Sequence, residues 1–217
     1  MGRILFIDMW PDELPPGVLR PRYADVPACV QAHGHELVPI HHRQLPSDTQ
    51  GPLLAVIISG SRTNLVDELR EDPQDGRLLS EFAGVEHFLE GLPEVLPVLG
   101  ICFGHQFLAK SGGGRLERMA RERDENDFPL REAEDDPLLR GLGTPARFVE
   151  SHGWRVAAPG AHYRVVARSD DGIEMVRHER LPRVGVQFHP EYFARQVAPR
   201  QGHADGRIFL DNWLRQL

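Results

Sequence analysis

Residues 95–114, VLPVLGICFGHQFLAKSGGG, give a clear indication of the fold. They read as a short apolar strand, a tight turn, a helix and a glycine-rich exit. Gly100, Cys102 and Gly104 have the spacing of a nucleophile elbow, in which small neighbours let a strained residue expose its reactive atom. The helix that follows would place its N-terminal N–H groups beside the Cys102 sulfur and favour the thiolate. A buried cysteine beside a packing glycine is the competing interpretation.

Similar short apolar runs occur on either side of this stretch. Several are continuous rather than alternating, which is typical of strands buried on both faces of a parallel sheet. They lie at residues 4–7, 37–40, 53–58, 95–99 and 184–188, and helical patterns lie between them at 24–34 and 75–91. This alternation predicts an α/β domain. Closely spaced short strands between residues 147 and 191 predict an antiparallel extension, and residues 207–217 predict a terminal helix.

Composition sets limits on the class of protein. The chain has 217 residues, of which 41% are hydrophobic and 26% charged, and no linker or repeat divides it, so residues 1–217 are expected to form one domain. The net charge of −7 and the lack of a basic run predict no nucleic-acid partner. No apolar stretch approaches the roughly 20 residues of a membrane span, so no membrane partner is expected. The two cysteines, Cys29 and Cys102, do not make a disulfide framework, which favours a reducing, cytoplasmic setting.

A cysteine nucleophile needs a histidine that moves protons and a group that orients that histidine. His189 and Glu191 lie two residues apart at the end of an apolar strand. In extended backbone this spacing points both side chains to one face, so Glu191 could bind one ring nitrogen while the other faces Cys102. An ordinary strand end explains the His-Pro-Glu sequence alone, but its combination with the elbow favours a catalytic set.

The motif GICFGHQ (residues 100–106), followed by VQFHPE (residues 186–191), resembles the class I, triad-type glutamine amidotransferase family. The order and separation of the two motifs match, and weaker similarity extends over the whole chain. The resemblance implies a flavodoxin-like, open, mostly parallel sheet flanked by helices, with a small antiparallel extension. It also implies hydrolysis of the glutamine side-chain amide through a γ-glutamyl thioester, with release of ammonia. Cys102 is then the nucleophile, His189 the base and then acid, and Glu191 its orienting group.

The resemblance further implies an oxyanion hole made of backbone N–H groups. One belongs to Phe103, directly after the nucleophile, and the other to Gly60 or Ser61 in the turn VIISGSRTN (residues 56–64). Ser61 stands where relatives usually have a second glycine, which leaves open which of the two residues supplies the donor.

Four residues are implied to bind the substrate amino acid. Gln106 lies one turn into the helix after Cys102, and the segment ESHGWRV (residues 150–156) contributes Ser151, Gly153 and Trp154. Relatives often carry an acidic residue or phenylalanine at the position of Trp154. No cofactor is expected. No metal site is predicted either, because the histidines at residues 33–35 and 41–42 lack a second cluster at ligand spacing.

Three functions remain open from the sequence. The first is a GMP-synthase-glutaminase-like enzyme that acts on glutamine alone or supplies ammonia to a separate synthase, which would predict an apolar face around the mouth of the site. The second is a stand-alone γ-glutamyl hydrolase or peptidase that uses the same triad on another γ-glutamyl compound. The third is a non-catalytic binding module, which the intact set of Cys102, His189 and Glu191 argues against.

Overall fold

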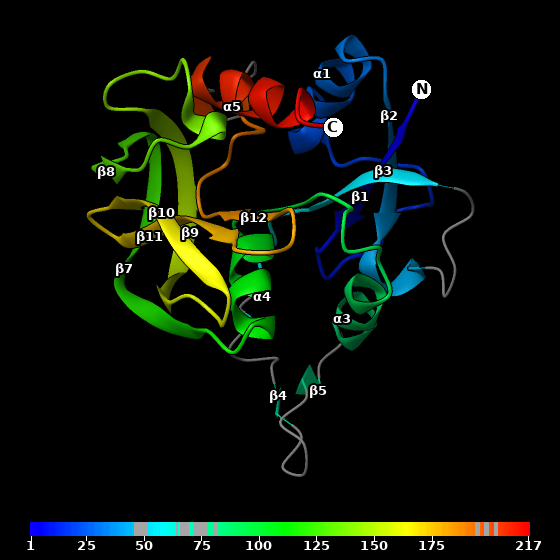
Figure 1. Ribbon diagram of the computed structural model, residues 1–217, viewed down its shortest axis with the longest axis horizontal. Coiled ribbons are helices and arrows are strands. Elements are labelled where there is room, and N and C mark those ends of the chain that lie inside the picture. The colour runs from blue at the N-terminus through cyan, green and yellow to red at the C-terminus, as the bar shows by residue number, and fades with distance from the viewer. Residues whose placement is uncertain are drawn as a thin grey trace.

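The parallel strands make up one half of a ten-stranded sheet (Figure 1). The structure is a computed structural model that describes residues 1–45, 52–63, 65, 70–71, 78–79, 82–193, 196–197, 200–201 and 204–217. In that part of the chain the parallel strands lie in the order β2 (Glu36–His41), β1 (Arg3–Asp8), β3 (Leu53–Ile58), β6 (Val98–Ile101) and β12 (Arg183–Val186). This is the strand order of a flavodoxin-like sheet, as the resemblance implied.

The antiparallel strands continue the same sheet beyond β12. Strand β12 pairs with β11 (Gly172–His178), which pairs in turn with β10 (Tyr163–Ser169) and with β9 (Arg147–Ala158). Strand β10 pairs with β8 (Glu132–Ala133), and β9 pairs with β7 (Arg115–Pro129). Because β7 has 15 residues and β9 has 12, the antiparallel portion is larger than the small extension expected from the sequence.

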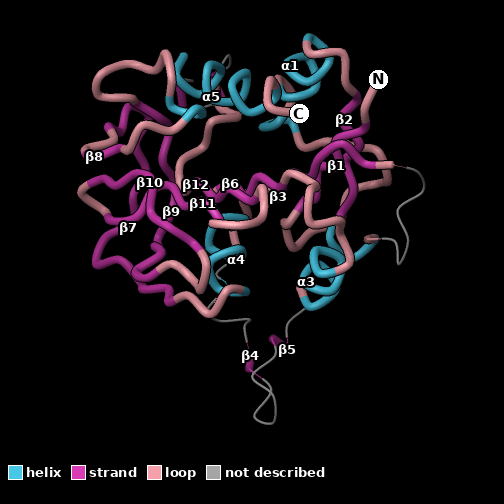
Figure 2. The backbone as a smooth tube through the Cα atoms, viewed as in Figure 1, coloured by secondary structure: helices cyan, strands magenta, loops and turns pink. Residues whose placement is uncertain are grey.

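Helices cover both faces of the parallel strands (Figures 1 and 2). Helix α1 (Val26–Ala32) contacts α5 (Ala204–Leu214) on one face, and α3 (Ala83–Glu90) and α4 (Phe103–Ser111) pack on the other. Short 3-10 turns occur at η1 (Pro21–Tyr23), η2 (His42–Gln44) and η3 (Pro137–Leu139). None of the helices in the described ranges is both long and apolar enough to span a bilayer.

Strands β1, β3 and β6 each contribute to two separate hydrophobic cores. Ile4 and Phe6 of β1 belong to the core beneath α1 and α5, whereas Leu5 and Ile7 belong to the core beneath α3 and α4. Successive side chains of a strand point to opposite faces, so a strand covered on both sides must be apolar throughout. This explains the continuous apolar runs in the sequence.

Two predicted elements differ from the structure. The helix expected over residues 75–91 begins only at Ala83. Leu78 and Leu79, assigned to its apolar face, form the short strand β5 (Leu78–Leu79), because that backbone pairs with β4 (Arg70–Glu71); residues 75–77 and 80–81 lie outside the described ranges. The strand expected at residues 95–99 begins at Val98, because the preceding residues form a turn that leaves Val95 83% exposed. Two further short strands, β13 (Gln196–Val197) and β14 (Arg200–Gln201), pair with each other in antiparallel fashion.

The order of the strands brings the predicted site residues to one edge of the sheet. Strands β3, β6 and β12 are parallel neighbours, so their carboxyl ends lie together. The residues that follow these ends include Gly60, Cys102 and His189. Ligands of open α/β sheets bind at the carboxyl ends of the strands, which makes this edge the place to look for a site.

The start of α4 approaches β3 more closely than any side chain would permit. A Cβ atom added to Gly104 would lie 2.4 Å from the carbonyl oxygen of Ile58 in β3. A Cβ atom added to Gly100 would lie 2.5 Å from the carbonyl oxygen of Gly104. Both glycines of the elbow are therefore required for packing, since they let the helix begin directly against the neighbouring strand.

We predict that Gly104→Ala destabilises the fold by about 2 kcal/mol or more, because α4 and β3 must move apart to admit the methyl group. Gly84→Ala is the matched control, since Gly84 lies in α3 and an added Cβ has open space around it. Alanine is the better helix former, so this control should gain roughly 0.5–1 kcal/mol. Urea unfolding of both variants measures the difference, and equal effects would contradict the packing argument.

Candidate active site

Cys102 stands at the junction of β6 and α4 with a strained backbone. Its φ is 51° and its ψ is −99°, a conformation that residues other than glycine rarely adopt. Holding a residue there costs on the order of 1–3 kcal/mol. The Cys102 N–H donates a hydrogen bond of 2.7 Å to the carbonyl oxygen of Val186 at the end of β12, which ties the turn to the next strand. The cysteine is thus held in the tethered, strained turn that an elbow requires.

His189 and Glu191 form a buried pair. The distance from His189 Nδ1 to Glu191 Oε1 is 2.8 Å, so Nδ1 donates to the carboxylate and Nε2 is left to interact with Cys102. Burial alone would lower the pKa of His189, but the negative charges of Glu191 and Cys102 outweigh burial and raise this pKa well above its ordinary value. The arrangement therefore favours an imidazolium beside the sulfur.

Two neighbours restrict the His189 ring. The Tyr192 ring stacks on it, with centroids 4.7 Å apart and an interplanar angle of 8°. Gly60 approaches the same ring, since an added Cβ atom would lie 3.1 Å from His189 Cε1 and 3.6 Å from Cys102 Cβ. A larger residue than glycine at this position would push the His189 ring by a few tenths of an ångström, so glycine lets the turn after β3 lie close to both side chains.

A pocket of about 500 Å³ opens at this edge of the sheet. It is lined by every predicted site residue except Glu191, which contacts His189 instead. The lining residues among those predicted are Gly60, Ser61, Cys102, Phe103, Gln106, Ser151, Gly153, Trp154 and His189. The structure thus gathers residues from four separate segments of the sequence around one cavity.

The predicted backbone donors lie at well-defined turns. Phe103 is the first residue of α4, so its N–H has no acceptor within the helix. The carbonyl oxygen of Gly60 accepts a hydrogen bond of 3.3 Å from the Tyr23 hydroxyl, which fixes the turn after β3. The Ser61 hydroxyl accepts from the Thr63 N–H at 3.1 Å, so this side chain closes the turn.

The residues predicted to bind the substrate lie in the opposite wall. Gln106 Nε2 donates to the carbonyl oxygen of Trp154 at 2.8 Å and to Oε1 of Gln187 at 3.1 Å. Both amide hydrogens of Gln106 are used within the protein, so its carbonyl oxygen is the atom available to a ligand. The carbonyl oxygen of Ser151 lies 3.8 Å from Cys102 Sγ, and Gly153 and Trp154 continue the same wall.

Two residues that were not predicted from the sequence, Gln187 and Tyr192, contact the predicted triad. Gln187 is fully buried, and its Nε2 lies 3.6 Å from Cys102 Sγ. Its spacing of two residues from His189 is a signal that could have identified it, because extended backbone places both side chains on one face. Tyr192 carries no such signal, since its stacking on His189 depends on the turn after β12.

Comparison with known proteins identifies sequence relatives of this chain. The family described as Glutamine amidotransferase class-I matches residues 77–200. A glutamine-hydrolyzing GMP synthase subunit of Methanosarcina barkeri is 37% identical over 156 residues, which cover 69% of this chain and 77% of that protein. The protein of the same name from Pyrococcus abyssi is 38% identical over 118 residues, or 54% of this chain. The chain spans only 62% of the length of the Pyrococcus protein.

Solved structures agree on the fold. A putative GMP synthase subunit from Thermoplasma acidophilum has a TM-score of 0.75 and 18% identity, with 99% of this chain and 93% of that chain covered. A glutamine amidotransferase from Thermotoga maritima has a TM-score of 0.68 and 19% identity, with 99% and 81% covered. At such identities the likeness shows the fold alone. The family match and the Methanosarcina relative show that this chain belongs to the class I glutamine amidotransferase family.

Proposed function

We propose that residues 1–217 form a single glutaminase domain that hydrolyses the side-chain amide of glutamine and releases ammonia. Membership of the family supports enzymatic activity on glutamine. The observation that carries the proposal is the buried set of Cys102, His189 and Glu191 at a pocket of about 500 Å³. Cys102 is the nucleophile, His189 the general acid and base, and Glu191 the group that holds the His189 ring.

The first half-reaction forms a thioester. The Cys102 thiolate attacks the γ-carbonyl carbon of glutamine, a C–S bond forms, and the carbonyl π electrons move to oxygen. When the tetrahedral intermediate collapses, the C–N bond breaks and the nitrogen takes a proton from His189 Nε2 to leave as ammonia. In the second half-reaction His189 accepts a proton from water, the water oxygen attacks the thioester, and glutamate and the thiolate are released.

Backbone donors stabilise the charge that develops on the carbonyl oxygen. The Phe103 N–H lies at the start of α4, where the helix dipole adds positive potential. The second donor comes from Gly60 or Ser61, in the turn that reaches both Cys102 and His189. Such donors cost no rearrangement during the reaction because the turn is already held by Tyr23.

The opposite wall binds the amino acid end of glutamine. The carbonyl oxygen of Gln106 accepts from the substrate ammonium group, since both its amide hydrogens are engaged. Ser151, Gly153 and Trp154 orient the rest of the amino acid from β9. This places the γ-carbonyl next to Cys102, whose sulfur lies 3.8 Å from the Ser151 carbonyl oxygen.

A synthase subunit is the partner that would receive the ammonia. The Methanosarcina and Pyrococcus relatives are named as subunits of GMP synthase, which supports this inference. Such a partner was expected to dock against an apolar face around the mouth of the site. Arg62, whose side chain is 63% exposed, instead lines the pocket together with Arg22 and Glu122. A partner that docks there would meet charged groups.

We predict that Cys102→Ala lowers ammonia release from glutamine by at least about a thousandfold and leaves the fold intact. Cys29→Ala is the matched control. Burial raises the pKa of the Cys29 thiol to about 12, so this cysteine stays protonated and unreactive. Ammonia release and circular dichroism of both variants give the comparison, and unchanged turnover in Cys102→Ala would refute the mechanism.

The same assay separates the substrates that the triad could accept. Glutamine and γ-glutamyl dipeptides are supplied in parallel to the purified chain. Faster Cys102-dependent turnover of glutamine supports the glutaminase, whereas a preference for dipeptides makes the chain a γ-glutamyl hydrolase. If neither substrate is turned over but Cys102 is still alkylated faster than Cys29, the isolated chain lacks a component that turnover requires, such as the synthase subunit.

We predict that Glu191→Gln lowers kcat by at least about tenfold and moves the alkaline limb of the kcat/KM profile to lower pH. The Glu191 charge helps to raise the pKa of His189, so its removal lowers that pKa and the imidazolium is lost earlier as pH rises. Glu132→Gln, at an exposed position in β8, is the control and should leave the profile unchanged. An unshifted alkaline limb in Glu191→Gln would show that Glu191 does not set the His189 pKa.

A further inference from the structure

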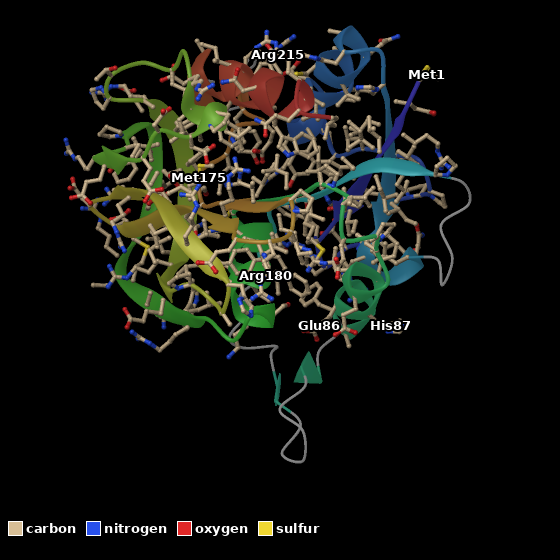
Figure 3. All side chains as sticks on the ribbon, in the orientation of Figure 1. Met1, Glu86, His87, Met175, Arg180 and Arg215 are labelled. Atoms are coloured by element: carbon tan, nitrogen blue, oxygen red, sulfur yellow. The ribbon has the colours of Figure 1, made fainter. Side chains whose placement is uncertain are left out.

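A second group of buried titratable side chains lies beside the substrate-binding wall, and one of its members, His152, also lines the pocket. Glu150 and His152 belong to β9, and Glu174 belongs to β11, next to the buried Met175 that Figure 3 labels. The three side chains each offer one nitrogen or oxygen atom, and these atoms lie within 4.8 Å of one another. Glu150 and Glu174 are 1% exposed and His152 is 7% exposed. The mechanism proposed above uses none of them.

If both carboxyl groups are ionised, this cluster leaves polar atoms unsatisfied. Within the described part of the chain, four of its buried atoms then have no hydrogen-bond partner, namely Glu150 Oε1, Glu150 Oε2, His152 Nε2 and Glu174 Oε2. Yet His152 Nε2 lies 3.2 Å from Glu150 Oε2, and the two carboxyl groups lie within hydrogen-bonding range of each other. Buried polar atoms left without a partner are rare and costly, so protons must be present on these groups.

The contacts at the two ends of the cluster fix where the protons lie. His152 Nδ1 lies 2.9 Å from the carbonyl oxygen of Trp154, which can only accept, so Nδ1 carries the ring hydrogen. His152 is neutral because burial lowers its pKa, and Nε2 must therefore accept a hydrogen bond. At the other end the Ser169 hydroxyl donates to Glu174 Oε1 at 2.5 Å.

We propose that Glu150 and Glu174 are both uncharged carboxylic acids that, with His152, form a one-way chain of hydrogen bonds positioning the substrate-binding segment of β9. Glu174 Oε2–H donates to Glu150 Oε1, and Glu150 Oε2–H donates to His152 Nε2. His152 Nδ1–H then donates to the carbonyl oxygen of Trp154. Every atom that lacked a partner gains one in this arrangement, and no charge is buried.

The surrounding charges agree with a neutral cluster. Burial raises the pKa of Glu150 to about 8, and burial together with the neighbouring Glu150 raises the pKa of Glu174 well above its ordinary value. The other charged or titratable groups that interact with the cluster are His105 of α4, His189 after β12, Asp171 after β10 and Arg123 of β7. Arg123 is engaged by Asp171 through two hydrogen bonds of 2.6 Å, and His189 is paired with Glu191. Neither cation is therefore available to balance two carboxylates.

The chain of hydrogen bonds ends at an atom that the active site also uses. The carbonyl oxygen of Trp154 accepts from His152 and from Gln106 Nε2. Gln106 Nε2 donates as well to Gln187, whose own Nε2 lies 3.6 Å from Cys102 Sγ. Glu150, His152 and Glu174 are therefore positioning residues for the substrate wall, an assignment that rests on the glutaminase function proposed above.

Glutamine substitutions separate this arrangement from an ionised one. The Glu150→Gln and Glu174→Gln side chains each have an NH2 group that can donate and a carbonyl oxygen that can accept, so each can reproduce the donor and acceptor of a neutral carboxylic acid in the chain of hydrogen bonds but not a carboxylate, which only accepts. We predict that Glu150→Gln/Glu174→Gln keeps the KM for glutamine at neutral pH within about threefold, whereas Glu174→Ala raises KM about tenfold. Glu179→Gln, at an exposed position after β11, is the matched control.

The pH dependence gives a readout that a merely structural role would not move. A carboxyl group whose pKa is raised by folding contributes stability at low pH that is lost as pH rises through the folded pKa. The thermal midpoint of the native chain should therefore fall relative to that of the double glutamine variant as pH rises from the ordinary glutamate pKa of 4.5 through the Glu150 pKa of about 8. The two curves of thermal midpoint against pH should converge at acid pH. Titration of the histidines affects both curves alike, because both proteins contain the same histidines. Parallel curves would overturn the proposal.

Infrared spectroscopy tests the protons without any turnover, so it also distinguishes failure of this proposal from failure of the glutaminase assignment. The native chain at neutral pH should show the carbonyl band of protonated carboxyl groups, and the double glutamine variant should lose it. The lack of this band in the native chain would overturn the proposal. A double glutamine variant with a KM as high as that of Glu174→Ala would also overturn the proposal. A third contrary result would be one equivalent of zinc that binds to the native chain but not to the double variant, because Glu150, His152 and Glu174 would then be metal ligands.

Discussion

The close contact between the start of α4 and the backbone of β3 is the constraint on which the rest of the site depends. Gly104 lies so near to β3 that a Cβ atom on it would be only 2.4 Å from the Ile58 carbonyl oxygen, so the helix can begin there only without a side chain. That approach brings the turn carrying Cys102 beside the turn carrying Gly60. The hydrogen bond from the Cys102 N–H to Val186 then adds the end of β12, so three neighbouring strand ends meet around one sulfur atom.

Glu191 and Glu150 are both buried, and they show how the neighbouring groups determine the charge of a carboxyl group. Glu191 faces a histidine whose other neighbour is Cys102, and the negative charges of both neighbours outweigh burial and raise the pKa of the His189 ring. Glu150 faces a neutral histidine and a second carboxyl group, so ionisation would bury an uncompensated charge. In our proposals, the same residue types therefore serve proton transfer in one place and rigid positioning in the other. Burial is similar in both cases, and only the contacts differ.

Much of this arrangement could be predicted from the sequence because the decisive signals are local. The elbow glycines, the apolar strand before Cys102 and the two-residue spacing of His189 and Glu191 each concern a few adjacent residues. The roles of Tyr192 and Glu174 could not be predicted in this way, because the first depends on the turn after β12 and the second on which strands pair. The first part of the helix expected over residues 75–91 was wrong for the same reason: Leu78 and Leu79 fit a helical period, but pairing with β4 places them in a strand, and the helix begins at Ala83. Local pattern cannot report a competing tertiary contact.

The strained backbone of Cys102 has a consequence for how such a protein would change once its chemistry was no longer needed. A φ of 51° with a ψ of −99° suits glycine, and in the proposed mechanism the reactivity of the sulfur is what requires a side chain at this position. Selection for activity and selection for stability therefore oppose each other at one residue. In a descendant that kept the fold but not the activity, only selection for stability would remain, and it would favour glycine at position 102. Glycine at this position in an otherwise intact relative would thus be a mark of lost catalysis.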